Sequence, residues 1–134
     1  MQFEKFTNQL QQAFAEAQSM AIGNDHAAIE APHLLMALLN QQGSSVRPVL
    51  NKAGFDITSL ENKLSAQIDD LPKIKIPSGE VSVGNHLRRL LNLADRIARK
   101  NDDQYISSET VLLSFIEDKK DIGPTMSKFG DLTK

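Results

Sequence analysis

Apolar residues recur at intervals of three and four over most of the chain, which is the spacing of one face of an α-helix. The first such set runs from Phe3 to Ala21 and ends before Gly23. A second set, residues 34–39, follows Pro32. Proline suits a first helical turn, because the N–H that it lacks would have no partner there. The pattern therefore predicts a long helix followed by a short one.

Two further helices are predicted before the middle of the chain. Residues 46–53 form a third apolar face, which ends at Gly54. Glycine takes the left-handed conformation after a helix more easily than other residues. Asp56 is the predicted N-cap of a fourth helix, whose apolar positions over 57–71 stop at Pro72.

Residues 72–84 contain two prolines and two glycines without a helical period, so we predict a linker there. The alternating isoleucines and valines of this segment would also fit a pair of short strands, although such a pair by itself is only marginally stable. Beyond the linker, helical spacing resumes over 87–98, 111–116 and 122–129. The fold class predicted from this pattern is all-α.

The two halves of the chain repeat each other. A shift of 77 residues places five apolar residues on identical partners: Leu10 on Leu87, Ala17 on Ala94, Ala21 on Ala98, Ile29 on Ile106 and Leu35 on Leu112. We therefore predict a single domain over residues 1–134, built from two tandem repeats of roughly four helices with pseudo-twofold symmetry. Repeat one covers about 1–71, the linker about 72–84 and repeat two about 85–134. We expect repeat two to be truncated, because it has no counterpart of the fourth helix.

Composition narrows the classes of function. The chain has 134 residues, 40% of them hydrophobic, which is enough for one domain with its own core. It has no cysteine, which excludes disulfides, thiolate metal sites and a cysteine nucleophile. A formal charge of -2 argues against a general polyanion binder. We see no membrane-spanning run or signal peptide, and we expect a cytoplasmic protein without nucleic-acid or membrane partners.

Three sets of charged or titratable residues could indicate a metal site, a catalytic pair or a phosphate-binding surface, but each set also has a structural explanation. His26, Glu30 and His33 would face one way on a single helix, but Pro32 and the polar loop before it interrupt that helix, so we expect no metal site. Asp102 and Asp103 accompany no nucleophile and are typical of a turn. The basic residues of 88–100 are expected to form a solvated helix face.

Several stretches of this sequence resemble the Clp amino-terminal domain, the repeated helical module that precedes the ATPase rings of Hsp100 unfoldases. They are Phe6-Thr7 at the start of a helix, the run from Ile29-Glu30-Ala31-Pro32-His33 to Leu39, and Tyr105-Ile106-Ser107-Ser108-Glu109. Within that family the resemblance is closest to the ClpB-type disaggregases. It covers essentially the whole chain and includes signatures in both repeats.

The resemblance implies a non-enzymatic, substrate-binding module of a chaperone that acts in protein disaggregation and the stress response. The parent protein would be a hexameric AAA+ ATPase that uses ATP and magnesium and cooperates with the Hsp70 system, whereas this chain by itself would be monomeric and bind no cofactor. The sequence has no Gly-x-x-x-x-Gly-Lys-Ser/Thr phosphate loop. The partners implied are unfolded or aggregated polypeptides.

The resemblance also carries three substrate-contact positions over to this sequence, Thr7, Asp103 and Glu109. Apolar surface beside them is expected from Leu90, Leu91 and Leu93 and from position 110, where ClpB-like domains commonly have leucine. Thr110 stands there in this chain, which would reduce the apolar area.

Leu93 lies off the apolar stripe of its own helix. It either packs against the linker or forms an exposed wall for unfolded chains.

Two further functions stay open beside client binding. One is an adaptor-docking domain like those of ClpA and ClpC unfoldases, which are partnered with a protease. The other is a hydrolase, for which the chain has serines, histidines and carboxylates but no Gly-x-Ser-x-Gly turn.

Overall fold

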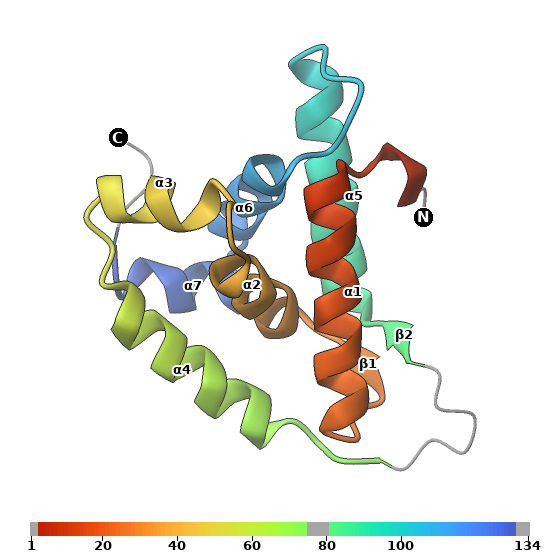
Figure 1. Cartoon of the computed structure of the whole chain (residues 1–134), viewed down its shortest axis with the longest axis vertical. Helices are drawn as coiled ribbons and strands as arrows, with labels where there is room; N and C mark the ends of the chain where they lie inside the picture. The colour runs from red at the N-terminus through yellow and green to blue at the C-terminus, as the bar shows by residue number, and fades with distance from the viewer. Residues whose placement is uncertain (1–2, 75–80, 131–134) are drawn as a thin grey trace.

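The computed structural model describes residues 3–74 and 81–130. Within these ranges the chain is built almost entirely of helices (Figure 1). In chain order they are η1, a 3-10 turn (Phe3–Lys5), α1 (Asn8–Gly23), α2 (Ala31–Asn40), α3 (Val46–Lys52), α4 (Ile57–Asp70), α5 (Asn85–Lys100), α6 (Ser108–Glu117) and α7 (Ile122–Ser127). Two short strands, β1 (Ala28–Ile29) and β2 (Ser82–Val83), complete the fold. The prediction of an all-α fold is confirmed.

Helices α2 and α6 lie at the centre of the molecule and contact each other (Figure 1). The long helix α1 packs on α2, and α5 packs on α6 in the same way. Helix α4 contacts both α2 and α7. The buried apolar side chains of both halves form one cluster, which includes Leu10, Leu34, Leu60, Leu87 and Phe115. The hydrophobic core is therefore shared between the halves.

The start of the chain differs from the prediction of one long helix from Phe3. Only η1 is helical there, and α1 begins at Asn8. Between them Phe6 pairs with Ile106 of the second half: the Ile106 N–H donates to the Lys5 carbonyl at 2.7 Å, and the Thr7 N–H donates to the Ile106 carbonyl at 3.0 Å. Because these backbone groups bond across the molecule, they cannot also bond within a helix.

A second pairing mirrors the first. Strands β1 and β2 run parallel with Ile29 opposite Val83, and the Gly84 N–H donates to the Ile29 carbonyl at 2.9 Å. A shift of 77 residues places Thr7 on Gly84 and Ile29 on Ile106. The bond from Gly84 to Ile29 is therefore the counterpart of the bond from Thr7 to Ile106. In each half, the segment before the first helix thus forms backbone hydrogen bonds with a loop of the other half. This arrangement is consistent with the predicted pseudo-twofold repeat. The repeat boundaries stay a prediction.

The predicted linker contributes to these pairings at both of its described ends. Val83 lies in a strand whose partner is Ile29 of the first half, not another part of the same segment. At the other end Lys73 bridges to His26, and the Ile74 N–H donates to the Asp25 carbonyl at 2.8 Å. Ile76 of the proposed strand pair lies outside the described residues.

The loops that follow α1 and α5 have the same backbone form. Asp25 and Asp102 both take the left-handed conformation, with φ of 58° and 60°. Aspartate is one of the few residue types that adopt this conformation readily. After each turn an N–H bonds back to the helix, from His26 to Ala21 at 2.9 Å and from Asp103 to Ala98 at 2.8 Å.

No helix within residues 3–74 and 81–130 is both long enough and apolar enough to cross a bilayer.

Candidate functional site

Thr7 has a structural role that is visible in its hydrogen bonds. It is the N-cap of α1, where its side-chain oxygen accepts the Leu10 N–H at 3.2 Å. Such a cap contributes about 1 kcal/mol to helix stability. Thr7 is half-buried, so part of the residue stays in contact with solvent.

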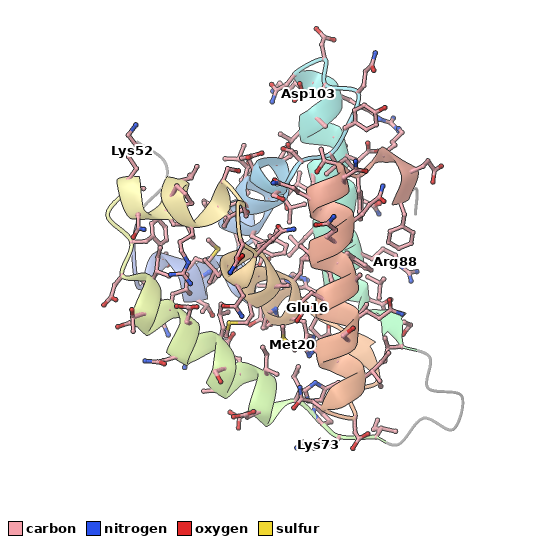
Figure 2. The ribbon with its side chains drawn as sticks, in the orientation of Figure 1. Glu16, Met20, Lys52, Lys73, Arg88 and Asp103 are labelled. Carbon is pink, nitrogen blue, oxygen red and sulfur yellow. The ribbon has the colours of Figure 1, made fainter. Side chains whose placement is uncertain are left out.

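Asp103 and Glu109 are exposed, and the pairing of Phe6 with Ile106 brings the segment between them to the start of α1. Asp103 lies in the loop after α5 (Figure 2). Glu109 lies in the first turn of α6 and accepts a hydrogen bond from the Ser45 hydroxyl. The three polar positions carried over by resemblance therefore flank one backbone pairing.

The apolar surface expected beside them is largely absent, because most of its residues are buried. Leu90 and Leu91 are 5% and 2% exposed and belong to the core between α5 and α6. Thr110 is 7% exposed, and its hydroxyl pairs with the Ser107 hydroxyl at 2.9 Å. The expectation that Leu90 and Leu91 add exposed apolar surface is wrong, because α5 turns its apolar stripe toward α6. Thr110 is buried on α6 itself. Leu93 is half-buried and keeps part of its side chain in solvent.

An open groove that the sequence pattern did not indicate lies beside α1. Its volume is about 760 Å³. It is lined by Phe3, Glu4, Gln11, Phe14, Ala15, Gln18, Ile29, Val81, Ser82, Val83 and Arg88. These residues come from η1, α1, both strands and the start of α5. Most of the lining surface is apolar, and we call this part the apolar floor; Glu4, Gln11, Gln18 and Arg88 add a carboxylate, two amides and a guanidinium to the lining.

Aromatic packing forms one end of the groove. The ring of Phe3 is 43% exposed and meets the rings of Phe6 and Phe14 edge-on, with centroids 5.4 and 5.1 Å away. The Gln11 amide holds η1 in place by donating to the Phe3 and Phe6 carbonyls at 3.3 and 3.0 Å. An exposed phenylalanine supported in this way offers a preformed apolar contact.

A smaller hollow of about 180 Å³ borders η1 at Lys5. Lys5, Phe6, Leu91, Asn92, Asp95, Arg99 and Ile106 line it. Asp95 lies between two cations there, 3.7 Å from the Lys5 ammonium and 3.1 Å from the Arg99 guanidinium. This hollow is more polar than the groove, and two ion pairs lie in its lining.

The two histidines of the rejected metal motif form a buried pair. The Glu30 N–H donates to Nδ1 of His33 at 2.9 Å, and Nε2 of His33 lies 2.9 Å from Nδ1 of His26. Nδ1 of His33 is therefore an acceptor, so the neutral ring carries its proton on Nε2 and donates to His26. Burial, and next the neighbouring His26, lowers the pKa of His33 from 6.5 to about 4. Burial also lowers the pKa of His26.

Neither histidine belongs to a metal site in the part of the chain that the structure describes. No group of three or more histidine, aspartate or glutamate side chains there is placed to hold a metal ion. The break before Pro32 sends His26 into the loop and leaves His33 in the first turn of α2. Three of the four ring nitrogens are used in hydrogen bonds, and Nε2 of His26 is buried without a hydrogen-bond partner among the described residues.

Comparison with known proteins identifies the family. Residues 5–129 match the family described as the Clp repeat (R) N-terminal domain. The chaperone protein ClpB of Pseudomonas putida is 47% identical over 130 residues, which cover 97% of this chain and 15% of that protein. The chain thus spans only a small part of the length of its curated relatives.

Solved structures share the fold at low sequence identity. The Hsp104 N-terminal domain from Candida albicans superposes with a TM-score of 0.81 at 18% identity, covering 92% of this chain and 81% of that one. A ClpV N-domain in complex with a VipB peptide superposes with a TM-score of 0.80 at 18% identity, covering 97% and 81%. At these identities the likeness concerns the fold alone.

Proposed function

The chain belongs to the Clp repeat N-terminal domain family, and from this premise we propose that it is the substrate-binding domain of a ClpB-type protein disaggregase. In this role it binds unfolded or aggregated polypeptides and passes them to ATPase rings outside this chain. The observation that carries the proposal is the open apolar groove beside α1.

The groove suits a ligand that offers apolar side chains in no fixed order. Burial of apolar surface is non-directional, so it gives affinity with little dependence on sequence. The volume of about 760 Å³ lies within the usual range for sites that hold small ligands. A preformed, open groove of this kind holds a few side chains of an extended segment and lets them go again.

A relative of the same fold supports a peptide as the occupant. The ClpV N-domain structure contains a VipB peptide, and that domain covers nearly the whole of this chain. By analogy, we assign polypeptide binding to this chain as well.

The surface around Thr7, Leu93, Asp103 and Glu109 is the second contact region that we propose. Its exposed carboxylates would hold backbone amides or cationic side chains of a client at the edge of the domain. Leu90, Leu91 and Thr110 would support this region from the core instead of touching the client.

The parent protein we propose is a cytoplasmic, hexameric AAA+ ATPase that uses ATP and magnesium and works with an Hsp70 system. This chain would act in it as a monomeric, non-enzymatic module. Client affinity should be weak, with dissociation constants of roughly micromolar or poorer, because the domain must release its client.

An amide NMR titration of residues 1–134 tests the proposal, using one model protein in its unfolded and its folded form. Shifts that cluster at the groove with the unfolded form alone are the expected result. Shifts confined to Thr7, Leu93, Asp103 and Glu109 would move the client site to that region. Binding of the folded form alone would favour adaptor docking, and no response to either form would overturn the proposal.

A matched pair of variants tests the groove directly. Ala15 is exposed on α1 and lines the groove, so Ala15→Glu places a carboxylate on the apolar floor. We expect client affinity to fall about tenfold, because a bound client would desolvate that charge without a partner. Ala66→Glu makes the same change at an exposed site on α4 and should leave both affinity and thermal stability unchanged. Equal affinity of the two variants would contradict binding in the groove.

A further inference from the structure

Helix α5 has an unusual concentration of positive charge. Five of its side chains are cationic and one is a carboxylate, whereas the whole chain has a formal charge of -2. The cations are Arg88, Arg89, Arg96, Arg99 and Lys100, and the carboxylate is Asp95. All five cations are exposed.

Four of these groups share one face of the helix. At about 100° per residue, Arg99 and Arg96 lie roughly 20° and 80° from Arg88 around the axis, and Arg89 lies roughly 100° away. Asn92 fills the position between Arg88 and Arg96. We call this set, from Arg88 to Arg99, the basic face.

Asp95, the one carboxylate of α5, neutralises only the Arg99 end of the basic face. Asp95 is paired with Lys5 and Arg99. Among the described residues, no salt bridge involves Arg88, Arg89 or Arg96. Packing several cations on one exposed face costs electrostatic energy, which a bound anion would relieve.

The basic face begins inside the groove. Arg88 lines the groove, and Figure 2 shows it at the edge of the molecule beside α1. From there the face runs along α5 past Asn92, so a chain leaving the groove in this direction meets Arg96 about 12 Å further on. Roughly four residues of an extended polypeptide cover that distance.

We propose that the basic face selects clients in which acidic residues flank the apolar segment held in the groove. The inference rests on the proposed function and adds a charge preference to it. The apolar residues supply the contact with Phe3, Phe14 and Val83, and glutamates or aspartates within the next four or so positions pair with Arg88 and Arg96. The groove and the basic face together then distinguish client segments that either surface alone would bind with equal affinity.

The apolar floor favours a polypeptide over a nucleic acid as the anion. A nucleic acid carries a phosphate on every residue, so following the basic face into the groove would place charges on apolar surface. A polypeptide can alternate the two kinds of contact. Preferential binding of a nucleic acid would therefore overturn the proposal.

The test is fluorescence anisotropy with two unstructured peptides, one with four glutamates after a shared apolar segment and one with four glutamines. At about 50 mM salt we expect the glutamate peptide to bind roughly fivefold more tightly, from a few exposed ion pairs. At about 500 mM salt the difference should vanish, because the charges are screened.

The double variant Arg88→Gln/Arg96→Gln should reduce the advantage of the glutamate peptide over the glutamine peptide to less than about twofold. Glutamine has a helix propensity close to that of arginine, so α5 should persist. The control, Lys52→Gln/Lys63→Gln, removes two exposed cations from α3 and α4, where Lys52 lies far from Arg88 (Figure 2). It should keep the full advantage.

Three results would overturn this inference: equal binding of the two peptides, an advantage that the control variant also loses, or tighter binding of a single-stranded oligonucleotide than of the glutamate peptide. Each leaves the proposed function intact as long as the glutamine peptide binds. Absence of binding by both peptides would overturn the proposed function instead.

Discussion

His33 shows how a titratable residue can serve the fold. It is fully buried, and its Nδ1 takes the place of the glutamate or glutamine that usually accepts the N-cap N–H in a capping box. A proton on that nitrogen would break the bond from Glu30. The side chain must therefore stay neutral for α2 to begin where it does.

This requirement predicts a loss of stability in mild acid. The folded state keeps His33 neutral down to its pKa of about 4, whereas the unfolded chain takes up the proton below 6.5. The unfolded state therefore binds more protons between these values, and the free energy of unfolding falls as the pH drops. We expect a loss of about 2 kcal/mol between pH 7.5 and pH 5, measured by urea denaturation.

His33→Gln is the matched variant, because glutamine can accept the Glu30 N–H without titrating. Its free energy of unfolding should be lower at pH 7.5 and should fall less steeply than that of the wild type down to pH 5, because only His26 of the buried pair still titrates. A wild-type curve as flat as that of the variant would contradict the account of the buried pair.

At the scale of helices, the ends depend on residues that the sequence marks clearly. After α3, Gly54 takes the left-handed conformation with φ of 87°. Asp56 caps the start of α4, where its side chain accepts the Ser59 N–H at 3.2 Å. Both features were predicted from residue type and position. Gly23, by contrast, ends α1 without a positive φ and has open space around its Cα.

The two glycines should respond oppositely to alanine. Gly54→Ala places a Cβ on a left-handed residue and should lower the free energy of unfolding by about 1 kcal/mol. Gly23→Ala reduces the entropy of the unfolded chain without strain and should raise it by about 0.5 kcal/mol. Thermal denaturation of both variants checks this, and a loss of stability in both would mean that the end of α1 needs glycine for another reason.

At the scale of the molecule, the halves depend on each other. The segments before α1 and α5 each bond to a loop of the other half, and α2 contacts α6 in the shared core. Separating the halves would expose both Ile29 and Ile106, which are 2% and 4% exposed in the intact chain. We therefore expect the two halves to fold as one unit.

We expect fragments 1–74 and 81–134 to be largely unfolded when separate and to regain helix content when mixed. The reason is that each half of the core is completed by the other. Far-UV circular dichroism of the fragments, alone and mixed, measures this. A cooperative unfolding transition in either fragment alone would show that the repeat is an independent unit.

Sequence reasoning succeeded wherever the determinants were local. The helical periods, the glycine after α3, the Asp56 cap and the break before Pro32 each depend on residues within a few positions of one another. The family resemblance likewise required only short motifs, and the comparison with relatives agrees with it. It also identified Thr7, Asp103 and Glu109, whose role in binding stays a prediction.

The tertiary structure alone decided the groove and the burial of Leu90 and Leu91. The groove joins Phe3, Phe14, Ile29, Val81 and Arg88, which are distant in sequence and meet only because the halves exchange their pairing segments. Periodicity defines an apolar stripe but not which neighbour covers it. Local propensity depends on bonds between nearby residues, whereas a groove depends on which distant surfaces are left uncovered after the core has formed.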